Sequence, residues 1–370
     1  MEDEKIILHY SPNLSMGGTA RMAADTAVAM QMGRWSRNVL LSPNGAAAGI
    51  PASYGIPCKR SRHLNVLRYP GEAQRLRRTA SSIHATTILL YGLSAARVAW
   101  LAYRHVPQPE RPRLVAILTG PVRGPFVPQT LALCDRVVAI SRHLRNTLHT
   151  PSLTPLLDKE KLWVVPYGVD EGLVHPHFTP SDPWKEDWER RYPGFHRTMS
   201  LCIPGAITPV RGLELLPELT KALQEQQLKV HFYIAGDVRR ADSAYLHKLQ
   251  ALYRREHLEN HVTWVAPKDG MRELMSLCDF TLSTATLPAT YDRAVLEALS
   301  LGARVVGFDH GVVGELLNTF LPEGRIPAGE INTMAEVLKQ WSIYRPETVA
   351  GVPYPYRITD TAHSLAKLAK

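Results

Sequence analysis

The segment 283–317, STATLPATYDRAVLEALSLGARVVGFDHGVVGELL, contains the residues best suited by type and spacing to chemistry. Glu297 lies one turn into a predicted helix that begins after an apolar strand, and its neighbours are Leu296 and Ala298. A carboxylate in such a setting seldom stays without a partner. Glu297 is therefore expected either to accept hydrogen bonds from the hydroxyls of a ligand or to form an ion pair within the protein. Asp292 is a suitable N-cap for the same helix.

Three other loops follow apolar strands and could contact an anionic ligand. Gly17 and Gly18 precede a helix whose free N–H groups could hold an anion, although a plain tight turn fits them equally. Arg211 follows Gly205 in a loop beside a helix start, where its guanidinium could complement a diphosphate or be solvated. Gly236 could border a nucleotide base or form a simple turn.

Short apolar strands alternate with helical stretches along the chain, as is typical of parallel sheets covered by helices on both faces. The first half has expected strands at Ile6–Tyr10, Asn38–Ser42, Thr87–Tyr91, Leu114–Leu118, Arg136–Ile140 and Leu162–Pro166. The second half has them at Ser200–Ile203, Val230–Ala235, His261–Val265, Phe280–Ser283 and Arg304–Phe308. Helices are expected between the strands, among them Ala20–Met32, Ala95–Arg104, Leu213–Gln226, Ala244–Arg255, Met271–Leu277 and Arg293–Leu301.

These patterns predict an α/β protein with two Rossmann-like domains that face each other across a cleft. A length of 370 residues suits two domains. The boundary is expected in the Gly-, Pro- and His-rich stretch 168–180, which gives domains at 1–172 and 173–355. The C-terminal helix, about 356–370, could pack back on the first domain. Ligands of such sheets bind outside the carboxyl ends of the strands, so the site is expected in the cleft.

The localisation expected from the sequence is cytoplasmic, with the cytoplasmic face of the inner membrane as an alternative. The acidic start MEDEK differs from a secretory signal, and no run approaches the ~20 apolar residues of a membrane span. The four cysteines are widely spaced, and buried free thiols are expected in preference to disulfides or metal ligands.

The chain is basic, with 43 Lys plus Arg against 34 Asp plus Glu and a net charge of +9. Basic residues gather between Lys59 and Arg78, where they could contact anionic lipid or phosphorylated substrate, or form a solvated helix face. Nucleic acid is not an expected partner, because no interleaved aromatic residues or nucleic-acid motif accompany the charge.

The ordered motifs of nearly the whole chain resemble those of one known family. SMGGTARMAADTA, DRVVAISRHLRNTL, VVPYGVDEGLVHP, GAITPVRGLELL and PATYDRAVLEALSLGARVVGFDHGVVGEL are similar to those of retaining, nucleotide-sugar-dependent glycosyltransferases of family 4 (group 1), which have the GT-B fold. The resemblance implies a nucleotide-sugar donor on the second domain, an acceptor on the first and no required metal or other cofactor. It implies contacts of Glu297 with the ribose, of Arg211 with the diphosphate, and of Gly17 and Gly18 with the donor.

The same resemblance identifies departures from the family pattern. Ala289 stands where the family has a glutamate that contacts the transferred sugar, and Asp292 stands where it has a glycine. Ala206 replaces an arginine expected at the diphosphate. Thr119 takes the place of a histidine beside the sugar and acceptor, and Val312 replaces a glycine in the "HGG" loop.

Two functions are compatible with this sequence. The first is a hexosyl- or glycosyltransferase acting on a cell-envelope glycan such as lipopolysaccharide or a lipid-linked saccharide. The second is a catalytically silent GT-B protein that binds a glycan, a nucleotide or a partner enzyme. Thr119 and Arg211 are candidate catalytic residues, and the candidate donor-binding residues are Gly17, Gly18, Gly205, Arg211, Gly236, Arg293, Glu297 and Glu315.

Overall fold

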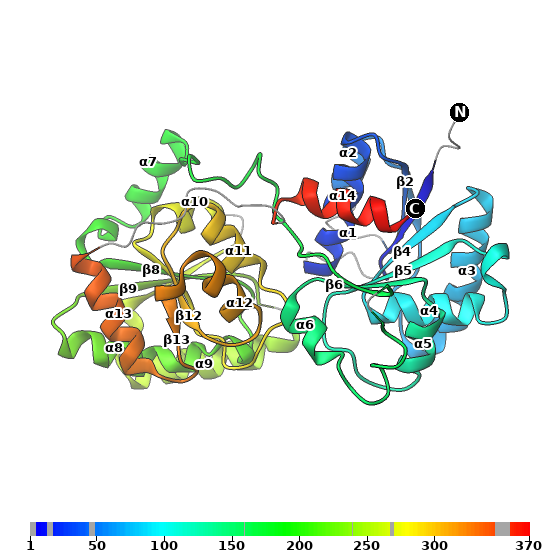
Figure 1. Cartoon of the computed structure of the whole chain (residues 1–370). Coiled ribbons are helices and arrows are strands. Elements are labelled where there is room, and N and C mark those ends of the chain that lie inside the picture. The colour runs from blue at the N-terminus through cyan, green and yellow to red at the C-terminus, as the bar shows by residue number, and fades with distance from the viewer. Residues whose placement is uncertain are drawn as a thin grey trace. The chain divides into compact units, whose positions relative to one another are not determined.

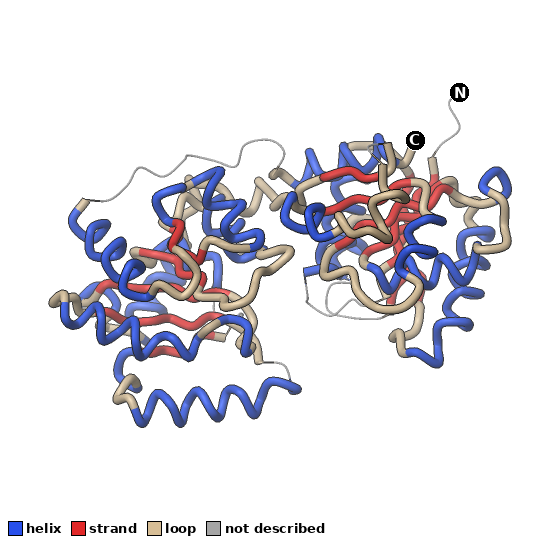
Figure 2. Tube along the Cα trace, turned by 60° about the horizontal axis from the view of Figure 1, so that its bottom comes forward, coloured by secondary structure: helices blue, strands red, loops and turns tan. Residues whose placement is uncertain are grey.

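The chain forms two compact units in the computed structural model, Met1–Asp170 with Pro353–Lys370 and Glu171–Val352 (Figure 1). The structure describes residues 5–12, 18–43, 49–158, 160–238, 240–266, 270–344 and 356–370. Each unit contains one sheet of parallel strands with helices on its faces, as Figure 2 shows in red and blue. Two Rossmann-like domains are therefore confirmed. Within the described part, no helix has the length and apolar character needed to cross a bilayer.

The first unit has a seven-stranded sheet in the order β3-β2-β1-β4-β5-β6-β7. Its strands are β1 (Ile6–Tyr10), β2 (Arg37–Ser42), β3 (Cys58–Arg60), β4 (Thr87–Tyr91), β5 (Arg113–Leu118), β6 (Arg136–Ala139) and β7 (Leu162–Val164). Its helices are α1 (Gly18–Met32), α2 (Gly49–Ser53), α3 (Tyr69–Ser82), α4 (Leu93–Tyr103), α5 (Val127–Leu133), α6 (Arg142–Thr147) and α14 (Ile358–Leu368). The expected strands are confirmed within two residues, whereas the edge strand β3, which contains Lys59 and Arg60, lacks an apolar pattern and was not predicted.

The second unit has a six-stranded sheet in the order β10-β9-β8-β11-β12-β13. Its strands are β8 (Met199–Pro204), β9 (Val230–Ala235), β10 (Val262–Val265), β11 (Phe280–Ser283), β12 (Val305–Phe308) and β13 (Arg325–Ile326). Its helices are α7 (Asp182–Arg191), α8 (Leu216–Glu225), α9 (Ser243–Arg255), α10 (Met271–Leu277), α11 (Arg293–Ser300), α12 (Gly311–Phe320) and α13 (Ile331–Ile343). The two-residue edge strand β13 was not predicted.

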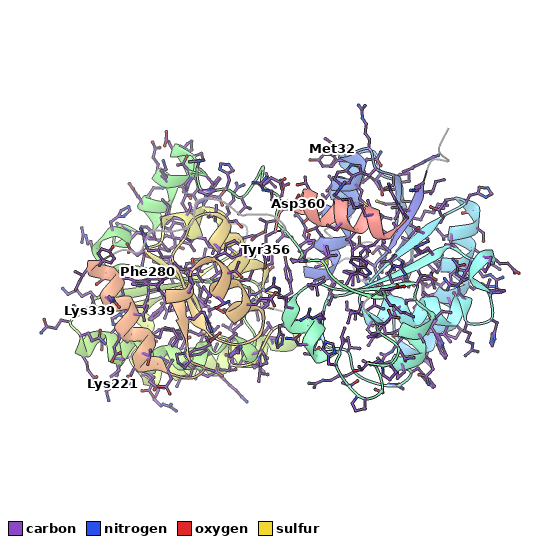
Figure 3. The ribbon with its side chains drawn as sticks, viewed as in Figure 1. Met32, Lys221, Phe280, Lys339, Tyr356 and Asp360 are labelled. Atoms are coloured by element: carbon purple, nitrogen blue, oxygen red, sulfur yellow. The ribbon has the colours of Figure 1, made fainter. Side chains whose placement is uncertain are left out.

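The core of the second unit is formed by apolar strand residues and the helices that cover them. Helices α8 and α13 pack side by side, and Figure 3 marks them by Lys221 and Lys339. Phe280 of β11, also labelled in Figure 3, lies with its ring 6.1 Å from that of Trp341 in α13. Both side chains are almost fully buried, so this contact joins the central strand to a covering helix.

Both sheets have a point at which the strand order reverses. It lies between β1 and β4 in the first unit and between β8 and β11 in the second. The loops after two such strands diverge to opposite sides of the sheet and leave a crevice, which is where ligands of open α/β sheets bind. Each unit therefore has one topologically preferred ligand position.

Helix α14 comes last in sequence and packs on α1. Asp360, labelled in Figure 3, lies in its first turn. The hydroxyl of Thr87 donates to the carbonyl of Ala369 at 2.9 Å, and this ties the end of the chain to β4. Gly168 lies against the backbone of Arg357, whose carbonyl carbon would be 2.2 Å from a Cβ, so the chain crossing requires glycine.

The cysteines differ in exposure. All four are free; Cys134 and Cys202 are buried, Cys278 is half-buried and Cys58 is exposed. Burial raises the pKa of the Cys134 thiol to about 12. The expectation of buried free thiols is wrong for Cys58, because it lies on the edge strand β3.

A buried polar network centres on His9 in β1. Its Nδ1 lies 2.9 Å from the Tyr91 hydroxyl and its Nε2 lies 3.1 Å from Asn38 Oδ1. The amide nitrogen of Asn38 donates to Ser36 and Gln31, so its oxygen must accept from His9 Nε2–H. Nδ1 then accepts from Tyr91, and the imidazole is neutral. Burial lowers the pKa of His9 from 6.5 to about 4.

We expect the folded chain to lose stability as the pH falls from about 6.5 to about 4. In that window His9 binds a proton in the unfolded chain and not in the folded one, so protonation favours unfolding. Above about pH 6.5 His9 is neutral in both states and the stability is not reduced. The loss from this group is about 3 kcal/mol of unfolding free energy. His9→Gln should flatten the dependence by a similar amount in urea unfolding at several pH values. Equal slopes in the two proteins would contradict the assignment.

Candidate functional site

Three loops of the second unit begin at the carboxyl edge of its sheet and contain predicted site residues. Gly205 and Arg211 follow β8, Gly236 follows β9, and Asp292 follows β11. The β8 and β11 loops lie on either side of the point at which the strand order reverses. Sequence-predicted donor residues therefore gather where an α/β sheet binds ligands.

Arg211 is held over the backbone of its own loop. Its Nη1 lies 2.7 Å from Asp292 Oδ2. Its Nη2 lies 2.5 Å from the position that a Cβ on Gly205 would take, and Gly205 has φ +117°. Only glycine allows this backbone conformation and this approach of the guanidinium. Arg211 is therefore fixed in position by an ion pair and by the surface beneath it.

Asp292 has two partners and is almost completely buried. One carboxylate oxygen accepts from the N–H of Val295 at 3.2 Å, which confirms the predicted N-cap of α11. The other accepts from Arg211. The side chain of Asp292 is 2 % exposed against 23 % for Arg211. A carboxylate buried to this extent needs a compensating charge, and Arg211 supplies it.

Glu297 is paired within its own helix. Its Oε1 accepts from Arg293 Nε at 2.6 Å, one turn apart on α11. The internal pair left open by the sequence is therefore confirmed. The pair is half-buried, with the Glu297 side chain 19 % exposed, and Oε2 is not used in this contact. Arg293 thus orients a carboxylate that can still accept from a ligand hydroxyl.

The loop after β12 is tied to the loop after β11. His310 Nε2 donates to the carbonyl of Ala285 at 2.8 Å, and the N–H of Val312 donates to the carbonyl of Ala289 at 2.8 Å. Gly311 has φ +57°, and a Cβ there would lie 2.6 Å from the Ala289 oxygen. Glu315 lies one turn into α12 and is half-buried. The contacts of His310 and Gly311 with the β11 loop were not predicted from the sequence. The only sequence signal is that the two residues stand at the start of α12.

Gly236 has a packing role. A Cβ on it would lie 1.9 Å from the carbonyl oxygen of Gly205. The loops after β8 and β9 therefore touch through backbone alone. The predicted contact of Gly236 with a nucleotide base stays a prediction.

The first unit has its own hollow at the carboxyl ends of β1, β4 and β5. Its volume is about 360 Å³. The described residues that line it are Ser11, Pro12, Thr19, Tyr91, Gly92, Leu93, Ser94, Arg97, Thr119, Gly120, Pro121 and Arg123. Thr119 Oγ1 lies 3.0 Å from Thr19 Oγ1, and it lies 3.5 Å from the position that a Cβ on Gly92 (φ +89°) would take. Gly18 begins α1, and Gly17 lies outside the described residues.

Arg97 is a cation in this hollow that sequence reasoning missed. Its Nη2 donates to the carbonyls of Arg123 at 2.8 Å and Pro125 at 3.2 Å. Gly124 (φ +102°) leaves room for this guanidinium, because a Cβ would lie 2.8 Å from it. The signal was hidden, because Arg97 lies within an apolar stretch of α4. Across the described ranges, no three His, Cys, Asp or Glu side chains gather as a metal site requires.

The chain is similar to known glycosyltransferases in part of its sequence and in its fold. Residues 186–342 match the family model described as glycosyl transferases group 1. HepE of Anabaena, solved in complex with UDP and glucose, is similar at 19 % identity with a TM-score of 0.74, covering 99 % of this chain and 95 % of that one. The chain has the GT-B fold.

Other solved proteins share the GT-B fold over nearly the full length. A glycosyltransferase of Rickettsia africae gives a TM-score of 0.76 at 13 % identity, covering 99 % of this chain and 93 % of that one. The lipopolysaccharide outer core galactosyltransferase WaaB gives 0.66 at 12 % identity and 99 % coverage of both chains. No curated protein sequence matches this one. The matched segment 186–342 contains both the Arg211–Asp292 and the Arg293–Glu297 ion pair.

We expect Asp292→Ala to destabilise the second unit by about 2–4 kcal/mol, because it removes a helix cap and leaves Arg211 without its partner. Asp292→Asn keeps the capping oxygen, so it should cost about half as much. Urea unfolding measures both.

Glu330→Ala is the matched control, since Glu330 precedes α13 without a side-chain capping bond. A change within about 0.5 kcal/mol is expected there. An Asp292→Ala effect of the same small size would show that the ion pair does not support the fold.

Proposed function

We propose that the chain is a nucleotide-sugar-dependent glycosyltransferase. It transfers a hexosyl group, with retention of configuration, to a cell-envelope glycan such as lipopolysaccharide or a lipid-linked saccharide. The observation that carries the proposal is the pairing of Arg211 with Asp292, and of Arg293 with Glu297, at the strand-order reversal of a group 1 domain. The names of similar structures support it, since HepE binds UDP and glucose and WaaB is a lipopolysaccharide galactosyltransferase.

Each donor group has a proposed protein partner in the second unit. Glu297, oriented by Arg293, accepts from the ribose hydroxyls. Arg211, whose guanidinium lies over the backbone of Gly205, donates to the diphosphate. Because the leaving group is an anionic nucleotide, positive charge fixed in advance at the diphosphate lowers the barrier to its departure. Glu315 on α12 and Gly236 complete the proposed donor site.

The acceptor is assigned to the hollow of the first unit. Thr19 and Thr119 offer hydroxyls to a saccharide, and Arg97 with Arg123 supplies positive charge. Thr119, which lines this hollow, is the proposed catalytic contact with the transferred sugar. The basic segment Lys59–Arg78 is proposed to bring the protein to anionic lipid at the cytoplasmic face of the inner membrane.

A second function has its own support. Asp292 engages Arg211, and Ala206 and Ala289 carry no charge at positions where the resemblance implies charged contacts. Each missing charge-assisted contact costs about 1.5–3 kcal/mol. A catalytically silent GT-B protein that binds a nucleotide or glycan as a regulator would keep the fold while having fewer charged groups at the donor site.

Calorimetric titration with UDP-, GDP- and ADP-sugars tests donor binding, and product analysis tests transfer or hydrolysis. We expect at least one donor to bind, and Glu297→Gln to weaken that binding about tenfold or more because one charge-assisted bond is lost. Glu336→Gln, the same change on the exposed side of α13, should leave affinity unchanged.

Three outcomes separate the candidates. Binding with turnover, both reduced by Glu297→Gln, supports the transferase. Binding without turnover on any acceptor supports the silent protein. Absence of binding across the panel contradicts the donor site itself.

A further inference from the structure

A second hollow of the first unit is strongly basic. It lies at the carboxyl ends of β2 and β3, and its volume is about 450 Å³. The described residues that line it are Pro43, Arg60, Ser61, Arg62, His63, Arg68 and Arg75. None of them lines the hollow beside Thr119. The four arginines come from β3, the loop that follows it, the 3₁₀ turn Val66–Arg68 and α3.

Four guanidinium groups surround this space with little internal compensation. Arg60 and Arg62 make no ion pair within the described chain. Arg68 donates from Nη1 to the carbonyl of His63 at 3.1 Å, a contact that fixes the loop without neutralising the charge. The basic segment is therefore not merely a solvated helix face, because arginines from a strand, a loop, a turn and a helix line one hollow.

Glu72 is the acidic group paired with this cluster. It is 2 % exposed, and its Oε1 accepts from the N–H of Arg62 at 3.2 Å and from Arg75 Nε at 3.3 Å. This carboxylate joins α3 to the loop that follows β3. One carboxylate against four arginines leaves a positive excess.

Ser61 supplies an independent sign of a ligand. Its side chain is 3 % exposed, yet its hydroxyl has no hydrogen-bond partner in the described structure. Its N–H donates to the carbonyl of Ser42 at 2.9 Å, which places the residue firmly on the sheet edge. A buried hydroxyl without a partner is costly, so a site that keeps one at the wall of a hollow is suited to a ligand oxygen.

We propose that this hollow binds a phosphoryl group. The guanidinium fork matches the spacing of phosphate oxygens, and the Ser61 hydroxyl completes the set of donors. The hollow is larger than an inorganic ion needs, which leaves room for the carrier of the phosphate. The proposal concerns the first unit alone and stands whether or not the donor site of the second unit is active.

The phosphoryl group has two chemical sources, a lipid headgroup and a soluble phosphate ester. Leu67 lies in the turn next to Arg68 and is 92 % exposed. An apolar side chain at this place would enter the acyl region if the phosphate belonged to a bilayer. The Leu67 side chain would not affect the binding of a soluble ester. Replacing Leu67 therefore distinguishes a lipid headgroup from a soluble phosphate ester.

Calorimetry with inorganic phosphate and glycerol 3-phosphate, and sedimentation with phosphatidylcholine vesicles with and without phosphatidic acid, test the full chain. We expect saturable binding in at least one arm, weakened about tenfold or more by Arg60→Gln/Arg62→Gln. The control Arg34→Gln/Arg37→Gln removes the same charge from exposed positions beside the start of β2, outside this hollow and outside the segment Lys59–Arg78, and should leave affinity within about twofold.

Ser61→Ala adds a readout independent of charge. It should weaken phosphate binding while the melting temperature stays equal or rises, because the substitution removes an unsatisfied buried hydroxyl. Vesicle binding reduced by Leu67→Ser identifies a lipid source, and ester binding unaffected by it identifies a soluble one. No saturable binding in either arm, or equal losses in the two double-arginine variants, would overturn the proposal.

Discussion

The ion pair between Arg211 and Asp292 is the constraint on which the second unit's site depends. It joins a loop after β8 to the first turn of a helix after β11, at the place where the strand order reverses. Asp292 also caps α11, so the same carboxylate fixes the start of the helix that carries Glu297. Gly205 is bare because the guanidinium lies over it. The Arg211 loop, the Asp292 cap and helix α11 therefore hold one another in position.

The fold and the proposed sugar transfer both call on the positive charge of Arg211. A carboxylate that is 2 % exposed requires a cation, and the proposed transfer would require the same cation beside the departing nucleoside diphosphate. Arg211 meets both requirements only if its free nitrogen atoms serve the diphosphate while the ion pair holds, or if the ligand draws it away from Asp292. The second route costs binding energy, which would weaken the donor rather than exclude it.

Much of the fold follows from the sequence, because parallel strands buried on both faces form continuous apolar runs. β4, β9 and β11 have the predicted bounds, and Asp292 caps α11 as expected. The edge strands β3 and β13 were missed because they are short and charged, and a sheet edge imposes no apolar pattern. The pairing of Arg211 with Asp292 could not be read from the sequence, since 81 residues separate the two and only the folded sheet brings them together. The sequence showed the basic segment Lys59–Arg78, but only the structure shows that its arginines line one hollow with Ser61.

The most direct test of this account is a crystal structure of the chain with UDP. We expect the ribose hydroxyls against Glu297 and the diphosphate beside Gly205, with a nitrogen of Arg211 within hydrogen-bond distance of a phosphate oxygen, about 2.7–3.2 Å. A UDP molecule bound elsewhere, or one that leaves Arg211 without any phosphate contact, would contradict the claim that this residue is shared between fold and donor.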